Sequence, residues 1–163
     1  MSALMAVCSF LAVPLGAVSF TLQTLAVYLA LFILGGRDGT VSVLVYLVLG
    51  AVGLPVFSGF RGGVGAFFDA GGGFLFGFLF AAAAFFLSEL VFGSGNIARL
   101  LSSLISLTFL YLCGAMWYAG VYLGSLCLLG EAIIATVAPF VIFDILKIAA
   151  AWFVSSRIPR HLL

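Results

Sequence analysis

Charged side chains are scarce in this sequence. Of its 163 residues, 7% are Asp, Glu, Lys or Arg, whereas 66% are hydrophobic. A soluble domain carries roughly 25% charged residues, so the composition excludes an ordinary soluble protein and predicts one embedded in a lipid bilayer. The formal net charge is +1 and there is no run of Lys or Arg. Nucleic acid is therefore excluded as a partner, because phosphate binding needs a concentrated basic surface.

Cysteine and histidine are also scarce. Cys8, Cys113 and Cys127 are odd in number and show no CxxC spacing, so they indicate neither a disulfide framework nor a metal site. The single histidine, His161, lies in a short basic C-terminal tail that we expect at the cytoplasmic membrane surface. No GxxxxGK[ST] pattern for ATP is present, and the apolar runs contain no catalytic cluster. We therefore expect neither an enzyme nor a cofactor, and any coupling to ATP must come from another subunit.

Long apolar runs, in contrast, fill the chain. A bilayer core about 30 Å thick takes about 20 apolar residues per helix, so the length allows about six spans and no separate soluble domain. We predict a single membrane-embedded domain over residues 1–163, all α-helical, with six transmembrane helices. No Lys or Arg precedes the first run, so we expect a span there rather than a cleavable signal peptide. Gly, Pro and charge clusters place the spans at Ala3–Leu15, Thr21–Leu34, Val41–Leu54, Phe74–Phe92, Leu101–Leu123 and Ala132–Val154.

The connection Pro55–Gly73 differs from the other loops. It is long and contains seven glycines interleaved with phenylalanines. Irregular backbone at membrane depth survives only where protein or a water-filled cavity satisfies its polar groups. We therefore expect this loop to cover a cavity, with a merely flexible connector as the alternative.

The arginines predict the orientation of the chain in the cell membrane. With both termini in the cytoplasm, four arginines lie inside, namely Arg37, Arg99, Arg157 and Arg160. Only Arg61 then lies outside, as the positive-inside rule prefers. The glycine-rich loop is consequently expected to face outward.

Asp144 and Lys147 are the most unusual residues, because both lie well inside the last apolar run. A separation of three residues puts their side chains about 60° apart around a helix and about one turn apart in height. Each charge costs about 2.5–3.5 kcal/mol at mid-membrane. Two interpretations stay open: the pair neutralises itself and holds the bundle together, or it binds a small molecule that carries a carboxylate and polar N–H groups.

A few other polar or aromatic residues are candidates for the same cavity. Gln23 stands at the outer start of the second span and fits a ligand contact or an interhelical hydrogen bond equally well. Tyr46 and Trp117 are suited to stack on a ligand ring, although core packing is the commoner role of such residues. Glu89 and Arg99 show no partner at ligand spacing, and snorkelling to the inner surface accounts for them.

Three segments of the sequence read SFTLQTL at 19–25, YLVLGAVGLPVF at 46–57 and FDILK at 143–147. Together they resemble the BioY family, the biotin-binding S components of energy-coupling-factor (ECF) importers. The resemblance implies a six-helix S-component fold, biotin held near the outer surface, and Asp144 and Lys147 as its polar contacts. It also implies association with a transmembrane coupling subunit and two cytoplasmic ATPases, although some family members are thought to act without them.

The chain departs from the family before the fourth span. Where the family usually reads G-P-T-G-G-Y, this sequence reads DAGGGF at 69–74, which loses the proline and threonine and gains the charge of Asp69. Gly72 and Gly73 match the retained glycines, so we count them among the predicted substrate-binding residues. The same fold with a different vitamin, or a purely structural membrane subunit, are the remaining alternatives.

Overall fold

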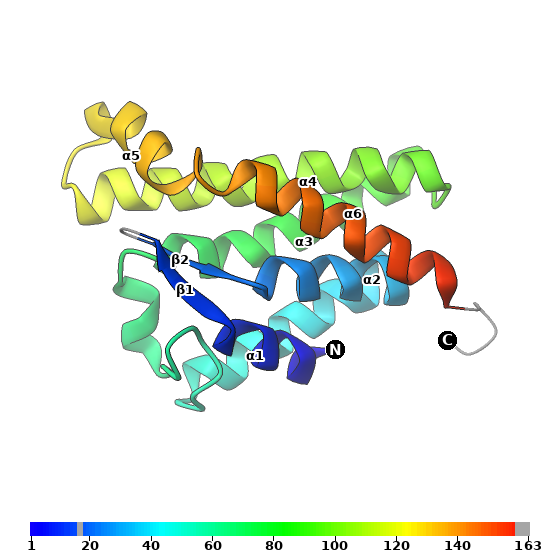
Figure 1. Cartoon of the computed structure of the whole chain (residues 1–163), viewed down its shortest axis with the longest axis horizontal. Coiled ribbons are helices and arrows are strands. Elements are labelled where there is room, and N and C mark those ends of the chain that lie inside the picture. Colours follow the sequence, from blue (N-terminus) through cyan, green and yellow to red (C-terminus); the bar gives the residue numbers. More distant parts are fainter. Residues whose placement is uncertain (16–17, 159–163) are drawn as a thin grey trace.

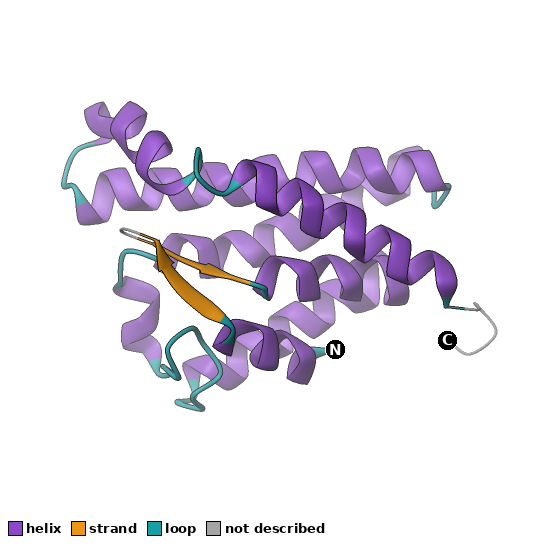
Figure 2. Ribbon diagram, in the orientation of Figure 1, coloured by secondary structure: helices purple, strands orange, loops and turns teal. Residues whose placement is uncertain are grey.

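The structure of the chain, a computed structural model, describes residues 1–15 and 18–158. Within this part the fold is helical, with one small hairpin (Figures 1 and 2). The main elements are α1 (Ser2–Phe10), β1 (Ala12–Leu15), β2 (Val18–Thr21), α2 (Gln23–Ala51), α3 (Gly72–Phe92), α4 (Asn96–Trp117), α5 (Leu129–Thr136) and α6 (Val141–Arg157). Three short helical segments join them: η1 (Val64–Phe68), η2 (Tyr118–Tyr122) and η3 (Leu126–Leu128). The predicted all-helical fold with six helices is confirmed. Two of the predicted spans, the first and the last, are not continuous helices in the structure.

The first predicted span, Ala3–Leu15, is wrong as a single helix. Helix α1 ends at Phe10, and the chain continues into an antiparallel hairpin whose register pairs Ala12 with Thr21. Nine helical residues rise only about 13.5 Å, which is well short of a bilayer core. The hairpin follows because the segment carries a proline and several β-branched residues, which favour extended backbone over helix.

Helix α2 contains the second and third predicted spans as two antiparallel halves. The backbone at Gly35 has φ 82° and ψ 169°, a conformation that glycine adopts at low cost. The chain reverses there (Figure 1). The halves pack so closely that a Cβ on Gly39 would lie 2.9 Å from the Cα of Leu31. The second half begins directly after Gly35, earlier than the predicted start at Val41.

The last predicted span, Ala132–Val154, is also broken. The helical stretches Leu126–Thr136 and Val141–Arg157 meet at an angle of 60°. Pro139 lies in the break. Proline lacks the N–H of a helical hydrogen bond and its ring clashes with the preceding turn, so the helix ends and restarts. The break places Asp144 in the first turn of α6.

Length and apolarity qualify two continuous described helices as membrane spans, Gly72–Phe92 and Asn96–Tyr122. Gln23–Ala51 passes the same test only when its two halves are counted as one helix. The bent pair Leu126–Thr136 and Val141–Arg157 also qualifies if it is taken as one span. Exposed side chains along these helices are largely Leu, Val, Ile and Phe, as expected for surfaces that face lipid. The chain is a multi-pass membrane protein.

Of the described helices, α3 and α4 make the most extensive contact with each other. Small residues allow this approach, because a Cβ on Gly73 would lie 2.2 Å from the Cβ of Trp117. Ser106 of α4 donates to the carbonyl oxygen of Ala81 at 2.7 Å. In lipid, such small and hydroxyl side chains drive helix association in place of hydrophobic burial.

The two ends of the bundle differ in content. The β1–β2 hairpin, the connection between α2 and α3, and α5 lie at one end (Figure 1). The reversal at Gly35, the α3–α4 connection and the end of α6 at Arg157 lie at the other. This arrangement matches the predicted separation of Arg61 from Arg37, Arg99 and Arg157. Arg160 and His161 lie outside the described residues.

Glu89 and Arg99 do not snorkel into solvent, contrary to the sequence interpretation. Their side chains are 14% and 18% exposed, and the Arg99 Nε lies 3.4 Å from the Glu89 Oε1. The Glu89 Oε2 accepts a hydrogen bond of 2.7 Å from the backbone N–H of Gly36. Arg99 also donates to the carbonyl oxygen of Phe32 at 3.4 Å. The pair therefore anchors the Gly35 reversal to α3 and α4.

Candidate ligand-binding site

A cavity of about 330 Å³ lies within the hairpin end of the bundle. This volume is at the lower end of the range for ligand pockets, roughly 300–1,000 Å³, and suits a small molecule. Its apolar walls are mainly aromatic and consist of Phe20, Phe57, Ala66, Ala70, Phe74, Leu75, Phe78, Leu110 and Phe140. Hydroxyl groups add a few polar points, from Ser19, Thr21, Thr24, Ser58, Tyr111, Tyr122 and Thr136.

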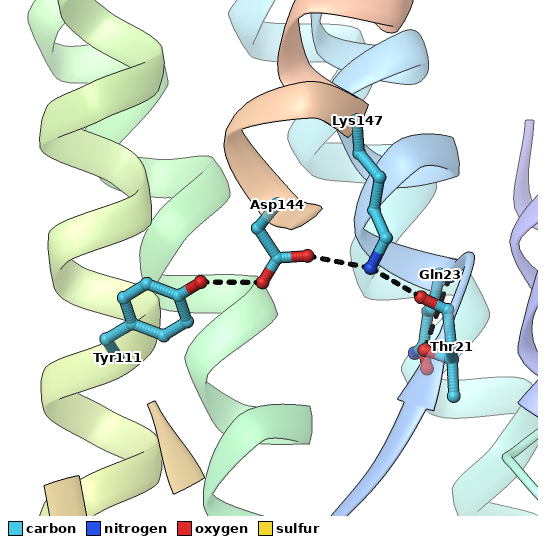
Figure 3. A network of polar contacts seen from close by, with 5 residues as sticks. All are labelled: Thr21, Gln23, Tyr111, Asp144 and Lys147. Carbon is cyan, nitrogen blue, oxygen red and sulfur yellow. Dashed lines mark hydrogen bonds and ion pairs between the residues drawn. The ribbon is translucent and has the colours of Figure 1, made fainter. Parts of the chain in front are cut away.

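Asp144 and Lys147 line this cavity and share a face of α6, as their spacing predicts. The Lys147 Nζ donates to the Asp144 Oδ1 at 2.7 Å (Figure 3). The two residues are 4% and 7% exposed, so solvent screens their attraction little. The first two turns of α6 present them to a chamber whose walls combine aromatic rings with hydroxyl groups.

Each member of the pair has a further partner from another element. The Tyr111 hydroxyl of α4 donates to the Asp144 Oδ2 at 2.7 Å, and Lys147 donates to the carbonyl oxygen of Thr21 in β2 at 2.7 Å (Figure 3). The ammonium also lies 4.0 Å from the ring centroid of Phe20, a cation–π contact. These contacts offset the cost of burying two charges. They also tie α6 to α4 and to the hairpin.

The structure shows the hydrogen-bond interpretation of Gln23, and its contact with a ligand stays a prediction. Its side chain lines the cavity, and its Nε2 donates to the Tyr46 hydroxyl at 3.0 Å, across the two halves of α2. Tyr46 in turn donates to the carbonyl oxygen of Val56 at 3.0 Å. Tyr46 is 1% exposed and packs edge-on against Phe57. It therefore supports the cavity wall from behind.

Four of the predicted substrate-binding residues do not line the cavity in the described part of the chain: Tyr46, Trp117, Gly72 and Gly73. The Trp117 Nε1 donates to the backbone oxygen of Asp69 at 3.2 Å, which fixes the end of the loop. A Cβ on Gly72 would lie 1.8 Å from the carbonyl oxygen of Phe67, so the glycine permits a close backbone contact. Direct ligand contact by these four residues stays a prediction, whereas their packing roles are visible.

The structure adds site residues that the sequence analysis did not select. Tyr111 and Phe20 contact the charged pair directly. Two sequence features could have pointed to them. Tyr111 carries a hydroxyl group within an apolar helix, and Phe20 lies in the segment at 19–25 that resembles the BioY family. Arg61 and Asp69 both line the cavity and form an ion pair across the glycine-rich loop. The unusual charge of Asp69 is thus matched within the loop itself, and the loop borders a cavity as predicted.

The sequence matches the BioY family over residues 1–163. The chain belongs to the BioY family. It is 38% identical to the "Probable biotin transporter BioY" of Pyrococcus horikoshii, over 96% of this chain and 90% of that protein. It is 35% identical to the "Biotin transporter BioY" of Thermotoga maritima, over 98% of this chain and 91% of that protein. These BioY relatives are named as transporters and not as enzymes.

The fold agrees with that of a solved S component. The structure superimposes with a TM-score of 0.79 and 24% identity on a protein described as the S-component for biotin from an ECF-type ABC transporter. The likeness covers 99% of this chain and 89% of that one, and it confirms the predicted S-component fold. The three segments on which the BioY resemblance rested all contribute to the cavity or its support, through residues such as Gln23, Phe57 and Asp144.

Proposed function

We propose that this chain is the biotin-binding membrane subunit of an ECF-type vitamin importer, capturing biotin at the outer face of the cell membrane. The observation that carries the proposal is the buried Asp144–Lys147 pair, which faces an aromatic cavity of about 330 Å³. Membership of the BioY family and the names of the relatives support it.

The chemistry of the cavity suits biotin. Biotin combines an apolar sulfur-containing ring and alkyl chain with a ureido group and a carboxylate. The Asp144 carboxylate is an acceptor for ureido N–H groups, and the third N–H of the Lys147 ammonium is a donor to the ureido oxygen. The Tyr111 hydroxyl, whose proton goes to Asp144, holds that carboxylate in place. The aromatic walls offer apolar surface to the ring and the chain. Donors and acceptor lie side by side, so a ligand with adjacent N–H and C=O groups can satisfy them together.

Equilibrium binding of labelled biotin to the purified protein in detergent micelles tests this function. A hydrogen bond to a charged group is worth about 1.5–3 kcal/mol, which corresponds to an affinity change of about 10- to 150-fold. The double variant Asp144→Asn/Lys147→Met removes both charges together, because a single variant would leave the other charge buried without its partner. We expect it to lose affinity by at least tenfold. Glu131→Gln on α5, an exposed residue outside the cavity lining, is the control.

The outcomes of this binding experiment separate the alternatives. Unchanged biotin affinity in the double variant would reject the site. Competition with a panel of unlabelled vitamins tests the ligand, and displacement of biotin by another vitamin at lower concentration would identify a different substrate.

We further propose that both termini are cytoplasmic and that the chain works with a transmembrane coupling subunit and two ATPases. The described arginines at the Gly35 end support this orientation, and no ATP-binding motif is present in the sequence. Biotin uptake in cells with and without genes for the coupling subunit and ATPases tests the partnership. Uptake that falls to background without them is expected, and undiminished uptake would mean that the chain transports alone.

A further inference from the structure

Four charged side chains line the cavity among the described residues, and they form two pairs of different character. The side chains of Asp144 and Lys147 are 5% and 8% exposed. Those of Asp69 and Arg61 are 49% and 53% exposed. Every cation of the cavity therefore already has an internal carboxylate partner. A ligand that brings its own carboxylate must share or replace one of these two.

Separating Asp144 from Lys147 costs more free energy than separating Arg61 from Asp69. Asp144 also accepts from Tyr111 at 2.7 Å, and Lys147 also donates to Thr21 at 2.7 Å. Removing either member from its partner would leave a buried charge without compensation, which is strongly unfavourable. A neutral polar group can instead donate to the remaining lone pairs of the Asp144 carboxylate and accept the third N–H of Lys147, without breaking the pair.

The Arg61–Asp69 pair is easy to separate, because water competes for both side chains. Exposed ion pairs change an equilibrium constant by about two- to fivefold. Both residues are also held independently of their mutual contact. The Arg61 Nε donates to the carbonyl oxygen of Ser58 at 3.1 Å. The backbone oxygen of Asp69 accepts from Trp117 at 3.2 Å and from the N–H of Gly72 at 2.9 Å. The Asp69 carboxylate can therefore rotate away while Arg61 and the loop backbone stay in place.

We propose that Asp69 is a displaceable counter-ion whose place at Arg61 is taken by the carboxylate of the ligand. This assigns the anionic end of the ligand to the loop side of the cavity. Its neutral polar end then lies at Asp144, Lys147 and Tyr111. Asp69 competes with the ligand for Arg61 and lowers the affinity for anions relative to neutral analogues. The identity of the ligand as biotin rests on the proposed function.

Binding of biotin and of its uncharged methyl ester to matched variants tests this proposal. Asp69→Asn preserves side-chain size and the backbone hydrogen bonds but removes the competing charge. We expect it to raise biotin affinity about two- to fivefold and to leave the affinity for the ester unchanged. Glu131→Gln removes one negative charge from exposed α5 at the same end of the bundle, and it should change neither affinity.

Arg61→Gln supplies the complementary measurement. It should weaken binding of biotin but not of the ester, and adding Asp69→Asn to it should have no further effect. A shift that is equal for biotin and ester in Asp69→Asn, or no shift at all, would overturn the assignment of Asp69 while leaving biotin binding established. Failure of the unmodified protein to bind biotin would instead refute the proposed function.

Discussion

Glu89→Gln is expected to loosen the reversal of α2 at the end of the bundle remote from the cavity. The Glu89 carboxylate accepts from the backbone N–H of Gly36 at 2.7 Å, at the start of the second half of α2. It also pairs with Arg99 at 3.4 Å. Glutamine keeps the size of the side chain and an acceptor oxygen, so the change isolates the charge.

The magnitude follows from two contributions. A hydrogen bond to a charged group is worth about 1.5–3 kcal/mol against about 0.5–1.5 kcal/mol for a neutral one. A negative charge at a helix N-terminus adds about 0.3–1 kcal/mol through the helix dipole. We therefore expect Glu89→Gln to lower the free energy of unfolding by about 1–2.5 kcal/mol. The loss should be largest at low salt, although burial of both side chains limits the screening.

Unfolding by SDS titration in mixed micelles, followed by tryptophan fluorescence, measures this free energy. Glu131→Gln, an exposed acid in α5, is the control and should stay within about 0.5 kcal/mol of the unmodified protein. Combining Glu89→Gln with Arg99→Gln should cost less than the sum of the single changes, since the two residues interact directly. A Glu89→Gln variant as stable as the control would refute the role of Glu89 at the reversal.

Two further predictions concern packing and orientation. Gly73→Ala should destabilise the protein by about 1–3 kcal/mol through overpacking, because its Cβ would lie 2.2 Å from that of Trp117. Gly65→Ala, where a Cβ would meet nothing within 4 Å, should cost little in the same SDS titration, and equal stability of both variants would contradict the packing role. A membrane-impermeant maleimide should label the exposed Cys127 in intact cells and fail to label Cys127→Ser. Labelling only after permeabilisation would show the opposite orientation.

Composition and hydropathy were sufficient to predict the class of the protein and most of its helices. The α3 helix was predicted within two residues of its observed start. A long apolar run between glycine-rich turns must form a helix in lipid, because only a helix satisfies its backbone hydrogen bonds internally. The glycine-rich loop was also predicted to cover a cavity, and its residues Arg61, Ala66 and Asp69 line one. These features depend on local sequence and on the solvent, and both are known before folding.

The errors fall where long-range packing competes with local preference. The run Ala3–Leu15 is apolar enough for a helix, yet its last residues, Ala12–Leu15, pair as a strand with Val18–Thr21. Glu89 and Arg99 are ten residues apart, and only the packing of α3 against α4 brings them together. Hydropathy records neither the hairpin register nor such a contact.

The same distinction between local sequence and long-range packing holds for the site. The spacing of Asp144 and Lys147 was enough to predict that they share a face, because residues three apart on a helix are neighbours whatever surrounds it. Their further partners depend on how the elements pack, since Tyr111 is 33 residues from Asp144 and Thr21 is 126 residues from Lys147. The tertiary structure likewise decided that the charge of Asp69 is matched by Arg61 at the cavity. Helical periodicity relates near neighbours, whereas contacts between elements depend on how the whole chain packs.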